Sequence, residues 1–275
     1  MIRTALKLAN VVARGYLGSP IRPSPLLARY VAALGCLRRG DCALDIGANI
    51  GFFAGLLAEA VGPQGRVLAF EPNPIPLKVL RASVRRSRLS QVKVFAQAVS
   101  DHAQELKLQT GWFDFGENAT VSSHLKTAER LGFFRRNLSI QAVRLDDFLK
   151  DDGLMVDGEK LPAPKFLKID TEGHELSVLT GAEKLLEKHA PTMVIEYGYD
   201  PRQPGHRYSY PAWLRARGYQ LLDFHGFVDF TPEFEAAIQH SYLTDLLAIP
   251  PGLQNSSYLT TIRGLGEFGL DRVES

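Results

Sequence analysis

Two glycines and two acidic residues stand where a nucleoside could bind. Gly47 and Gly51 follow the short apolar segment 42–46, and an apolar stretch rich in Ala and Leu comes directly after them. A glycine turn between a strand and a helix lets a ligand approach the backbone, and the first N–H groups of the helix can face a polar ligand. Glu71 ends the next apolar segment, where a carboxylate can accept both hydroxyls of a ribose. Asp45, two residues before Gly47, belongs to the same predicted nucleoside site.

The spacing of the glycines separates one class of nucleoside cofactor from another. A dinucleotide fingerprint reads G-x-G-x-x-G, and its middle glycine lets a pyrophosphate approach the backbone. Ala48 occupies that middle position here. The turn therefore disfavours NAD and FAD and favours a nucleoside without phosphates, such as S-adenosylmethionine. For the glycines taken alone, an ordinary tight turn in a strand–helix unit is the alternative.

A second group of ionisable residues follows the apolar segment 165–170. Asp170 ends that segment, and Glu172 and His174 stand at the entrance of the next helix. A carboxylate and a histidine together could deprotonate a hydroxyl nucleophile, which attack by oxygen on a methyl sulfonium needs. The structural alternatives are a helix N-cap for Asp170 and a partly exposed helix-start residue for His174. Spacing alone does not rank Glu172, His174 and Glu175.

Carboxylates near a ligand site also raise the question of a metal. Asp170, Glu172 and Glu196 could supply oxygen ligands for Mg²⁺, which prefers oxygen donors. No spacing in the sequence demands a metal, so none is predicted. The two cysteines, Cys36 and Cys42, fit no metal-binding spacing and are typical of a reducing compartment.

The order of apolar segments predicts the sheet that must position these residues. Parallel strands are expected at 42–46, 66–70, 92–99, 165–170 and 192–196, with intervening helices at 50–61, 75–88 and from the turn after Asp170 to about His189. Apolar strands that alternate with helices of this length indicate a doubly wound α/β fold. Segments 219–224 and 243–249 have the pattern of a hairpin. We therefore predict a seven-stranded, mostly parallel sheet whose last strand is antiparallel.

Residues outside this alternation divide the chain. Residues 1–40 are predicted to be an N-terminal helical extension, with apolar positions on one face of 1–14 and a second short helix at 26–37. That apolar face could pack on the rest of the chain or on a second copy, as a homo-oligomer. The α/β domain is expected to span 41–250, and 251–275 is a tail without a strong pattern.

Two irregular stretches lie within the α/β domain. Strands are expected at 105–109 and 139–144. Between them lies an insertion, 111–140, predicted to form a lid or a wall of the substrate site, with a poorly ordered surface loop as the alternative. Residues 151–164, after a short helix that begins at Leu145, have the composition of a polar surface loop.

Composition excludes some partners. The net charge of +2 is too small to argue for nucleic acid. No apolar run approaches the length that spans a bilayer, and Arg3 and Lys7 interrupt the apolar region that a signal peptide would need. We expect a cytoplasmic protein without a transmembrane segment.

Four motifs, in their order along the chain, resemble those of the FkbM-type methyltransferases. The motifs are Leu44–Phe52, Phe70–Pro74, Leu145–Phe148, and Leu167–Leu176 followed by Leu179–Ala182. The resemblance covers roughly residues 40–200. It implies a class I, Rossmann-like fold, S-adenosyl-L-methionine as cofactor, and methylation of a hydroxyl oxygen on a sugar, glycan or natural product.

The resemblance also implies where the cofactor would lie. The methionine part is expected beside Gly47, Asn49 and Gly51, the ribose on Glu71, and the adenine near Ala98 and Val99. The same motifs contain four further residues that we expect at the cofactor: Asp45, Ala48, Phe52 and Asn73. The family often has a small residue where His174 stands, so the resemblance assigns that histidine no role.

Two other functions compete with an O-methyltransferase. A nicotinamide-dependent reductase would require the middle glycine of the fingerprint and a proton donor such as a Tyr-x-x-x-Lys motif, and the sequence shows neither. A non-catalytic adenosyl-binding protein would bind the cofactor without turnover. The sequence does not identify the molecule that accepts the methyl group. Trp112, Phe113 and Phe115 would suit stacking on a sugar face or a planar polyketide, and equally an anchor for the loop.

Overall fold

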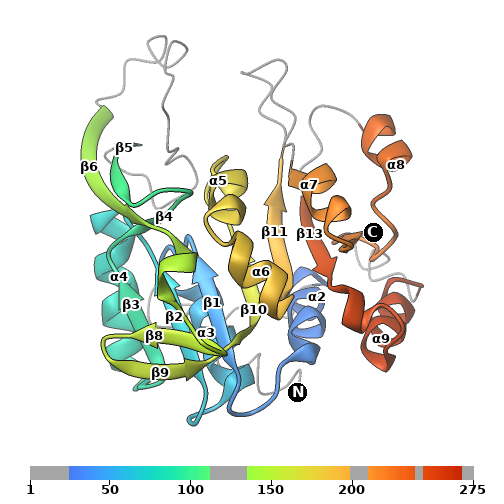
Figure 1. The fold of residues 1–275 in the computed structure, drawn as a ribbon, viewed down its shortest axis with the longest axis horizontal. Coiled ribbons are helices and arrows are strands. Elements are labelled where there is room, and N and C mark those ends of the chain that lie inside the picture. The colour runs from blue at the N-terminus through green and yellow to red at the C-terminus, as the bar shows by residue number, and fades with distance from the viewer. Residues whose placement is uncertain (1–24, 112–134, 199–209, 239–243, 268–275) are drawn as a thin grey trace.

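A seven-stranded sheet forms the centre of the molecule (Figure 1). The computed structural model describes residues 25–111, 135–198, 210–238 and 244–267. The strands of the sheet are β1 (Cys42–Ile46), β2 (Arg66–Phe70), β3 (Val92–Phe95), β10 (Pro164–Ile169), β11 (Thr192–Tyr197), β12 (Gln220–Asp223) and β13 (Thr244–Ile249). Their order is β12-β13-β11-β10-β1-β2-β3. Only β13 runs against its neighbours in this sheet. The prediction of seven strands with an antiparallel last strand is confirmed, and the fold is of the class I methyltransferase type.

Helices cover both faces of this sheet, which is why its central strands are buried on both sides. One face carries α2 (Pro25–Ala33), α3 (Phe52–Val61), α4 (Pro74–Arg86) and α9 (Ser257–Glu267). The other face carries α5 (Glu175–Thr180), α6 (Glu183–His189) and α7 (Tyr210–Ala216). Side chains of each strand alternate between the two apolar clusters: Ala43 and Phe166 point to the first, whereas Leu44 and Leu167 point to the second.

Two charged residues interrupt the first apolar face. Asp45 and Lys168 are register partners on β1 and β10, and they are 1% and 3% exposed. Charges are rarely buried this deeply unless they are paired or used. Both lie one or two residues from the carboxyl ends of their strands, the edge at which α/β proteins bind ligands.

The segment predicted as one strand at 92–99 is instead two. After Phe95 the chain leaves the main sheet, and β4 (Ala98–Val99) pairs with β6 (Arg135–Val143). Strand β6 also pairs with β5 (Gln104–Gly111), so these three strands form a separate small sheet. The expected strands at 105–109 and 139–144 therefore exist, and both begin earlier than predicted.

The prediction of a polar surface loop at 151–164 is wrong. β7 (Leu149–Lys150), β8 (Gly153–Val156) and β9 (Glu159–Pro162) form a third small sheet. Asp157 and Gly158, both at positive φ, make the two-residue turn between β8 and β9, a sequence that favours such hairpins. Leu154, Val156 and Leu161 are buried beneath it and explain why these short strands are stable.

Two further helical segments were not foreseen. α9 forms in the tail that was predicted to lack a pattern, and Leu259 and Ile262 bury it against the core. α8 (Pro232–Ala237) begins at Thr231, whose hydroxyl oxygen accepts the N–H of Phe234. The predicted helix that ends near His189 is broken into α5 and α6. A side chain at Gly181, between them, would lie 2.0 Å from the carbonyl oxygen of Ser100.

Some predictions fall outside the described residues. They concern the helical face of residues 1–14 and the aromatic residues Trp112, Phe113 and Phe115 of the insertion. Within the ranges that the structure describes, no helix has the length and apolar character needed to cross a membrane.

Candidate functional site

A cavity of about 220 Å³ opens at the carboxyl ends of β1, β2, β10 and β11. Six of the residues expected at the cofactor line it: Gly47, Asn49, Glu71, Asn73, Ala98 and Val99. The three expected catalytic residues, Asp170, Glu172 and His174, line the same cavity. The sheet thus brings together residues that are more than a hundred positions apart in the sequence.

The glycine turn is held tightly to its neighbours. Gly47 has a φ of +79°, and a Cβ there would lie 1.7 Å from the carbonyl oxygen of Asp170. The N–H groups of Gly47 and Ala48 donate to the carbonyl oxygen of Phe70 at 3.0 and 2.9 Å. These two N–H groups therefore bond to the protein and hold the turn against the end of β2. Gly47 is therefore required by close packing between β1 and β10.

Gly51 also has a packing role. Its φ is +95°, and a Cβ there would lie 2.7 Å from the side chain of Leu80 on α4. It occupies the N-cap position of α3. Gly51, Ala48 and Phe52 are not among the residues that line the cavity. Their effect on a ligand would be exerted through the shape of the turn.

Glu71 is the best-placed acceptor for a ribose. Its Oε2 accepts the N–H of Asn49 at 2.9 Å, and its Oε1 accepts the N–H of Asn73 at 2.7 Å. Each carboxylate oxygen retains a second lone pair for a further donor. Burial raises the pKa of Glu71 to about 7, against the two backbone bonds, which lower it. Asn73 is fixed in turn because its Oδ1 caps α4 by accepting the N–H of Ile75 at 3.1 Å.

Asp45 is a buried carboxylate whose oxygens both lack a hydrogen-bond partner in the described part of the chain. Burial raises its pKa to about 7, while the nearby Lys168 ammonium lowers it. A buried carboxylate without a donor is costly. Asp45 is not among the residues that line the cavity, but it lies two residues before Gly47, where an ammonium or N–H group of the methionine part would relieve that cost.

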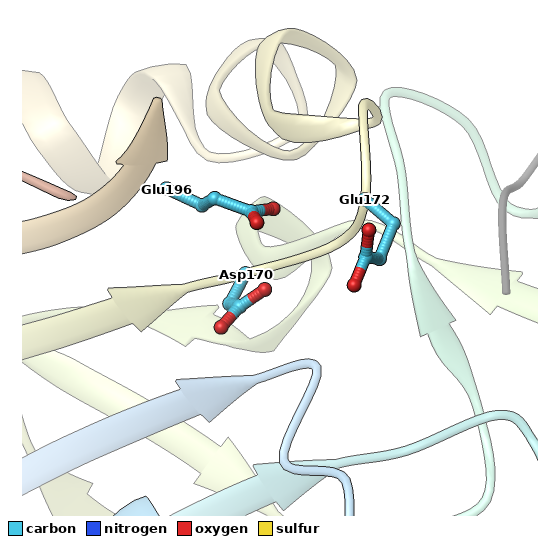
Figure 2. A group of neighbouring side chains, drawn as sticks. All are labelled: Asp170, Glu172 and Glu196. Atoms are coloured by element: carbon cyan, nitrogen blue, oxygen red, sulfur yellow. The ribbon is translucent and has the colours of Figure 1, made fainter. Parts of the chain in front are cut away.

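Three carboxylates gather opposite the glycine turn (Figure 2). One oxygen from each of Asp170, Glu172 and Glu196 lies within 4.8 Å of the other two. Glu196 comes from β11, and its Oε2 is buried without a hydrogen-bond partner among the described residues. Burial, followed by repulsion from Asp170 and Glu172, raises the pKa of Glu196 to about 9. Like charges this close need a proton or a cation between them, and a proton on Glu196 satisfies that need.

The turn that carries two of these carboxylates is braced by Glu175. Its Oε1 accepts the N–H groups of Thr171 and Gly173 at 2.9 and 3.2 Å, and also the hydroxyl of Thr171. Glu175 is fully buried, so it shapes the turn and does not face a substrate. Glu172 is held there at a φ of +55°. The alternative in which Asp170 caps the following helix is wrong, since His174 occupies the N-cap position of α5.

His174 faces the end of β4. Its Nε2 lies 2.9 Å from the hydroxyl of Ser100, and that hydroxyl donates to Asp101 at 2.9 Å. Its side chain makes no capping bond to α5. Burial lowers the pKa of His174, with Asp101 acting in the other direction. Near neutral pH the histidine is therefore a neutral base at one wall of the cavity.

The structure places three further residues beside the predicted catalytic set. Glu196 was not placed in that set, although it completes the carboxylate group. Ser100 gave no signal, since it lies far from His174 along the chain. The ammonium nitrogen of Lys168 lies 3.2 Å from Oδ2 of Asp170. In the sequence, Lys168 was only a charged residue that interrupts an apolar strand.

Comparison with known proteins agrees with this architecture. A family model described as the methyltransferase FkbM domain matches residues 45–221. Over 173 residues, the chain is 32% identical to 31-O-demethyl-FK506 methyltransferase FkbM of Streptomyces tacrolimicus, a match that covers 54% of this chain and 61% of that protein. It is 30% identical over 197 residues to methyltransferase sdnD of Sordaria araneosa, over 65% of this chain and 73% of that one.

A third relative is named for a sugar acid. Over 163 residues, the chain is 26% identical to hexuronic acid methyltransferase AglP of Haloferax volcanii, a match that covers 59% of each protein. The matched segments thus span less than two thirds of the length of two of these three relatives. Residues before Asp45, which include α2, and residues after Leu221, which include β13, lie outside the match of the family model.

Proposed function

The chain belongs to the FkbM methyltransferase family, and we propose that it transfers a methyl group from S-adenosylmethionine to a hydroxyl oxygen of a sugar, glycan or natural product. One observation carries the proposal: a single cavity joins Glu71, a ribose acceptor, to the carboxylates and histidine at the end of β10. The names of the relatives support oxygen as the acceptor atom and sugars or natural products as the acceptor class.

The residues present fit this cofactor. Glu71 would accept the ribose hydroxyls, and Ala98 and Val99 offer an apolar wall for the adenine. Asp45 has both carboxylate oxygens free of protein donors among the described residues, and the amino group of the methionine part would supply one. When bound, the cofactor supplies a methyl group already activated by the positive sulfonium.

The protein's part in the transfer is to orient the acceptor and to take its proton. The acceptor oxygen forms a bond to the methyl carbon as the bond from that carbon to sulfur breaks, and the hydroxyl proton passes to a base. Asp170, Glu172 and His174 are the candidate bases that line the cavity, whereas the raised pKa of Glu196 keeps it protonated at neutral pH. Orientation supplies much of the rate in such a transfer, and base catalysis about 10²–10⁴-fold.

Two measurements test the proposal. Titration calorimetry should show binding of S-adenosylmethionine and of its demethylated product. Binding of NADH or NADPH in place of S-adenosylmethionine would refute the proposal and favour a reductase. A screen of glycan, lipid-linked sugar and polyketide acceptors with radiolabelled cofactor should then show transfer to a hydroxyl. Tight cofactor binding with no transfer to any acceptor class would instead favour a non-catalytic adenosyl-binding protein.

A further inference from the structure

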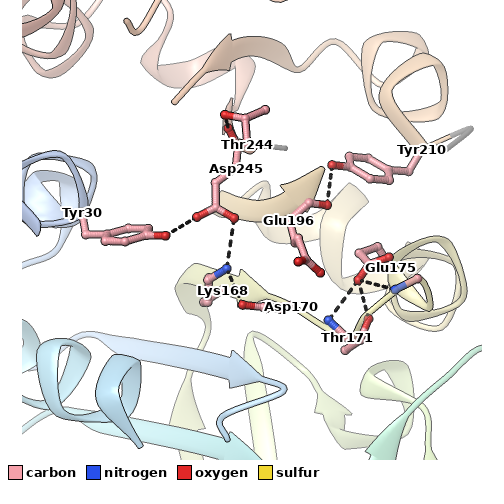
Figure 3. Close-up of polar contacts among 10 residues, drawn as sticks. Tyr30, Lys168, Asp170, Thr171, Glu175, Glu196, Tyr210, Thr244 and Asp245 are labelled. Atoms are coloured by element: carbon pink, nitrogen blue, oxygen red, sulfur yellow. Dashed lines mark hydrogen bonds and ion pairs between the residues drawn. The ribbon is translucent and has the colours of Figure 1, made fainter. Parts of the chain in front are cut away.

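A continuous line of polar contacts connects the N-terminal helix α2 to the cavity (Figure 3). The hydroxyl of Tyr30 donates to Oδ2 of Asp245. Oδ1 of Asp245 accepts from the ammonium of Lys168 at 3.3 Å. The same ammonium donates to Oδ2 of Asp170 at 3.2 Å. Helix α2, strand β13 and strand β10 thus each contribute to the position of one cavity residue.

The inner members of this line are almost completely shielded from water. The side chains of Lys168 and Asp245 are 3% and 10% exposed, whereas that of Asp170 is 40% exposed and reaches the cavity. A buried ion pair has a fixed geometry, because each charge loses much if its partner moves away. Lys168 also lies over the ring of Phe53, with its nitrogen 5.3 Å from the ring centre. The ammonium is therefore held on several sides.

Tyr30 is held as firmly as Lys168. Its ring meets Phe53 edge-on at 4.7 Å and lies against Phe224 at 4.8 Å. Burial, with the charge of Asp245, raises the pKa of Tyr30 far above neutral pH, so its hydroxyl remains a donor. Phe53 contacts both Tyr30 and Lys168, so one ring packs against two members of the line.

We propose that Lys168 and Tyr30 are positioning residues for the methyl transfer: Lys168 fixes the rotation of Asp170 in the cavity, and Tyr30 fixes Lys168 through Asp245. This inference rests on the proposed function for its catalytic consequence. Its structural part stands on the contacts alone. Tyr30 and Asp245 lie outside the segment that the family model matches, so this support is built from parts of the chain beyond the family's shared region.

The first test observes the line directly, in the full chain without cofactor or acceptor. Nuclear magnetic resonance follows the carboxyl carbon of Asp170 and the ammonium nitrogen of Lys168, with signals assigned by Asp170→Asn and Lys168→Met. Tyr30→Phe should move both signals. Tyr258→Phe is the matched control, since Tyr258 donates to the carbonyl oxygen of Ala33 at 2.7 Å and has no part in the line. If Tyr30→Phe leaves both signals where they were, the proposal is overturned.

The second test measures the consequence for transfer, with the acceptor found in the screen. Tyr30→Phe should lower kcat about threefold to tenfold, the equivalent of one hydrogen bond, with the KM for S-adenosylmethionine unchanged. Lys168→Met should lower kcat further. Lys165→Met, at an exposed position near the start of the same strand, is its control. Tyr30→Phe remains informative even if Lys168→Met fails to fold.

The two tests separate failure of this inference from failure of the proposed function. If no acceptor is methylated by the parent protein, the proposed function fails, and the resonance signals still decide whether Tyr30 acts on Asp170. If the signals move in Tyr30→Phe but kcat does not, the line is structural and the positioning role is overturned. A fall in kcat that Tyr258→Phe reproduces would also overturn it, because general loosening of α2 would then explain the effect.

Discussion

Glu71 accepts the backbone N–H of Asn49 at 2.9 Å, so one carboxylate joins the end of β2 to the glycine turn after β1. Asn49 adopts a φ of +48°, a left-handed conformation that asparagine tolerates better than most residues. This hydrogen bond, together with those from Gly47 and Ala48 to the carbonyl oxygen of Phe70, fixes the proposed contacts for the ribose and for the methionine part relative to each other. Loss of Glu71 would disturb both.

We predict that Glu71→Ala weakens binding of S-adenosylmethionine by about 1.5–3 kcal/mol, the range for a charged hydrogen-bond partner. Titration calorimetry measures this. Glu59→Ala on α3 is a suitable control, since Glu59 faces Arg39 and does not line the cavity. An unchanged affinity in Glu71→Ala would mean that the ribose lies elsewhere.

Cofactor affinity should rise with pH between about 6 and 8. Burial raises the pKa values of Glu71 and Asp45 to about 7, so both carboxyls are largely protonated at the lower pH. Binding that uses the ionised forms must then expel protons, and each unit of pH below the pKa costs up to about tenfold in affinity per group. Calorimetry across this range should give a smaller pH slope for Glu71→Gln and for Asp45→Asn than for the parent. An equal slope in all three proteins would contradict the prediction.

Glu196→Gln should stabilise the protein increasingly as pH rises. The folded-state pKa of Glu196 is raised from 4.5 to about 9, so the folded protein holds this proton more tightly than the unfolded chain does. The stabilising contribution is complete below about pH 4.5 and is lost as pH rises toward 9. Glutamine does not titrate, so the Glu196→Gln protein keeps this stabilising contribution at high pH. We expect the Tm advantage of Glu196→Gln over the parent protein to be clearly greater at pH 8.5 than at pH 5.

Scanning calorimetry checks this prediction. Glu187→Gln, an exposed position on α6, should show no such trend. A rise in the Tm of the parent protein on addition of Mg²⁺ at pH 7, absent in Glu196→Gln, would point to a divalent cation in the carboxylate group in place of the proton.

Asp170→Asn should lower the single-turnover rate of methyl transfer by about 10²–10⁴-fold, because Asp170 sits in the carboxylate group and is fixed against Gly47. His174→Ala should cost less, about tenfold, since its ring is engaged with Ser100. Both rates are measured at saturating cofactor and across pH. The reverse order would identify His174 as the base, and two unchanged rates would place the base outside this group.

The sheet was predictable because each of its strands has a recognisable pattern in its own local sequence. Segments such as 42–46 and 66–70 are apolar, short, and separated by helix-length stretches, so their bounds followed from the sequence. The hairpin at Asp157 and Gly158 carried a local signal as well, but its polar surroundings concealed it. The breaks after Phe95 and at Gly181 were not visible, because they arise where the chain meets other elements.

The cofactor side of the cavity was more readable than the acceptor side. Gly47 and Glu71 belong to one compact stretch of chain, whereas Glu196 joins Asp170 only because β11 lies beside β10. In the sequence, Lys168 was a single charged residue within an apolar strand. Its contacts are with Asp245 on β13, which also binds Tyr30 on α2. Neither the position of β13 in the sheet nor the packing of α2 can be inferred from spacing along the chain.

The absence of a side chain at Gly47 has a mechanical consequence. Its backbone sits so close to the carbonyl of Asp170 that the ends of β1 and β10 must move as one body. Separating β1 from β10 at this end of the cavity would disrupt that close packing. Another side of the cavity is lined by Ala98, Val99 and Leu108, which belong to the separate sheet of β4, β5 and β6. We therefore expect any change in the width of the cavity to come from that sheet and not from β1 and β10.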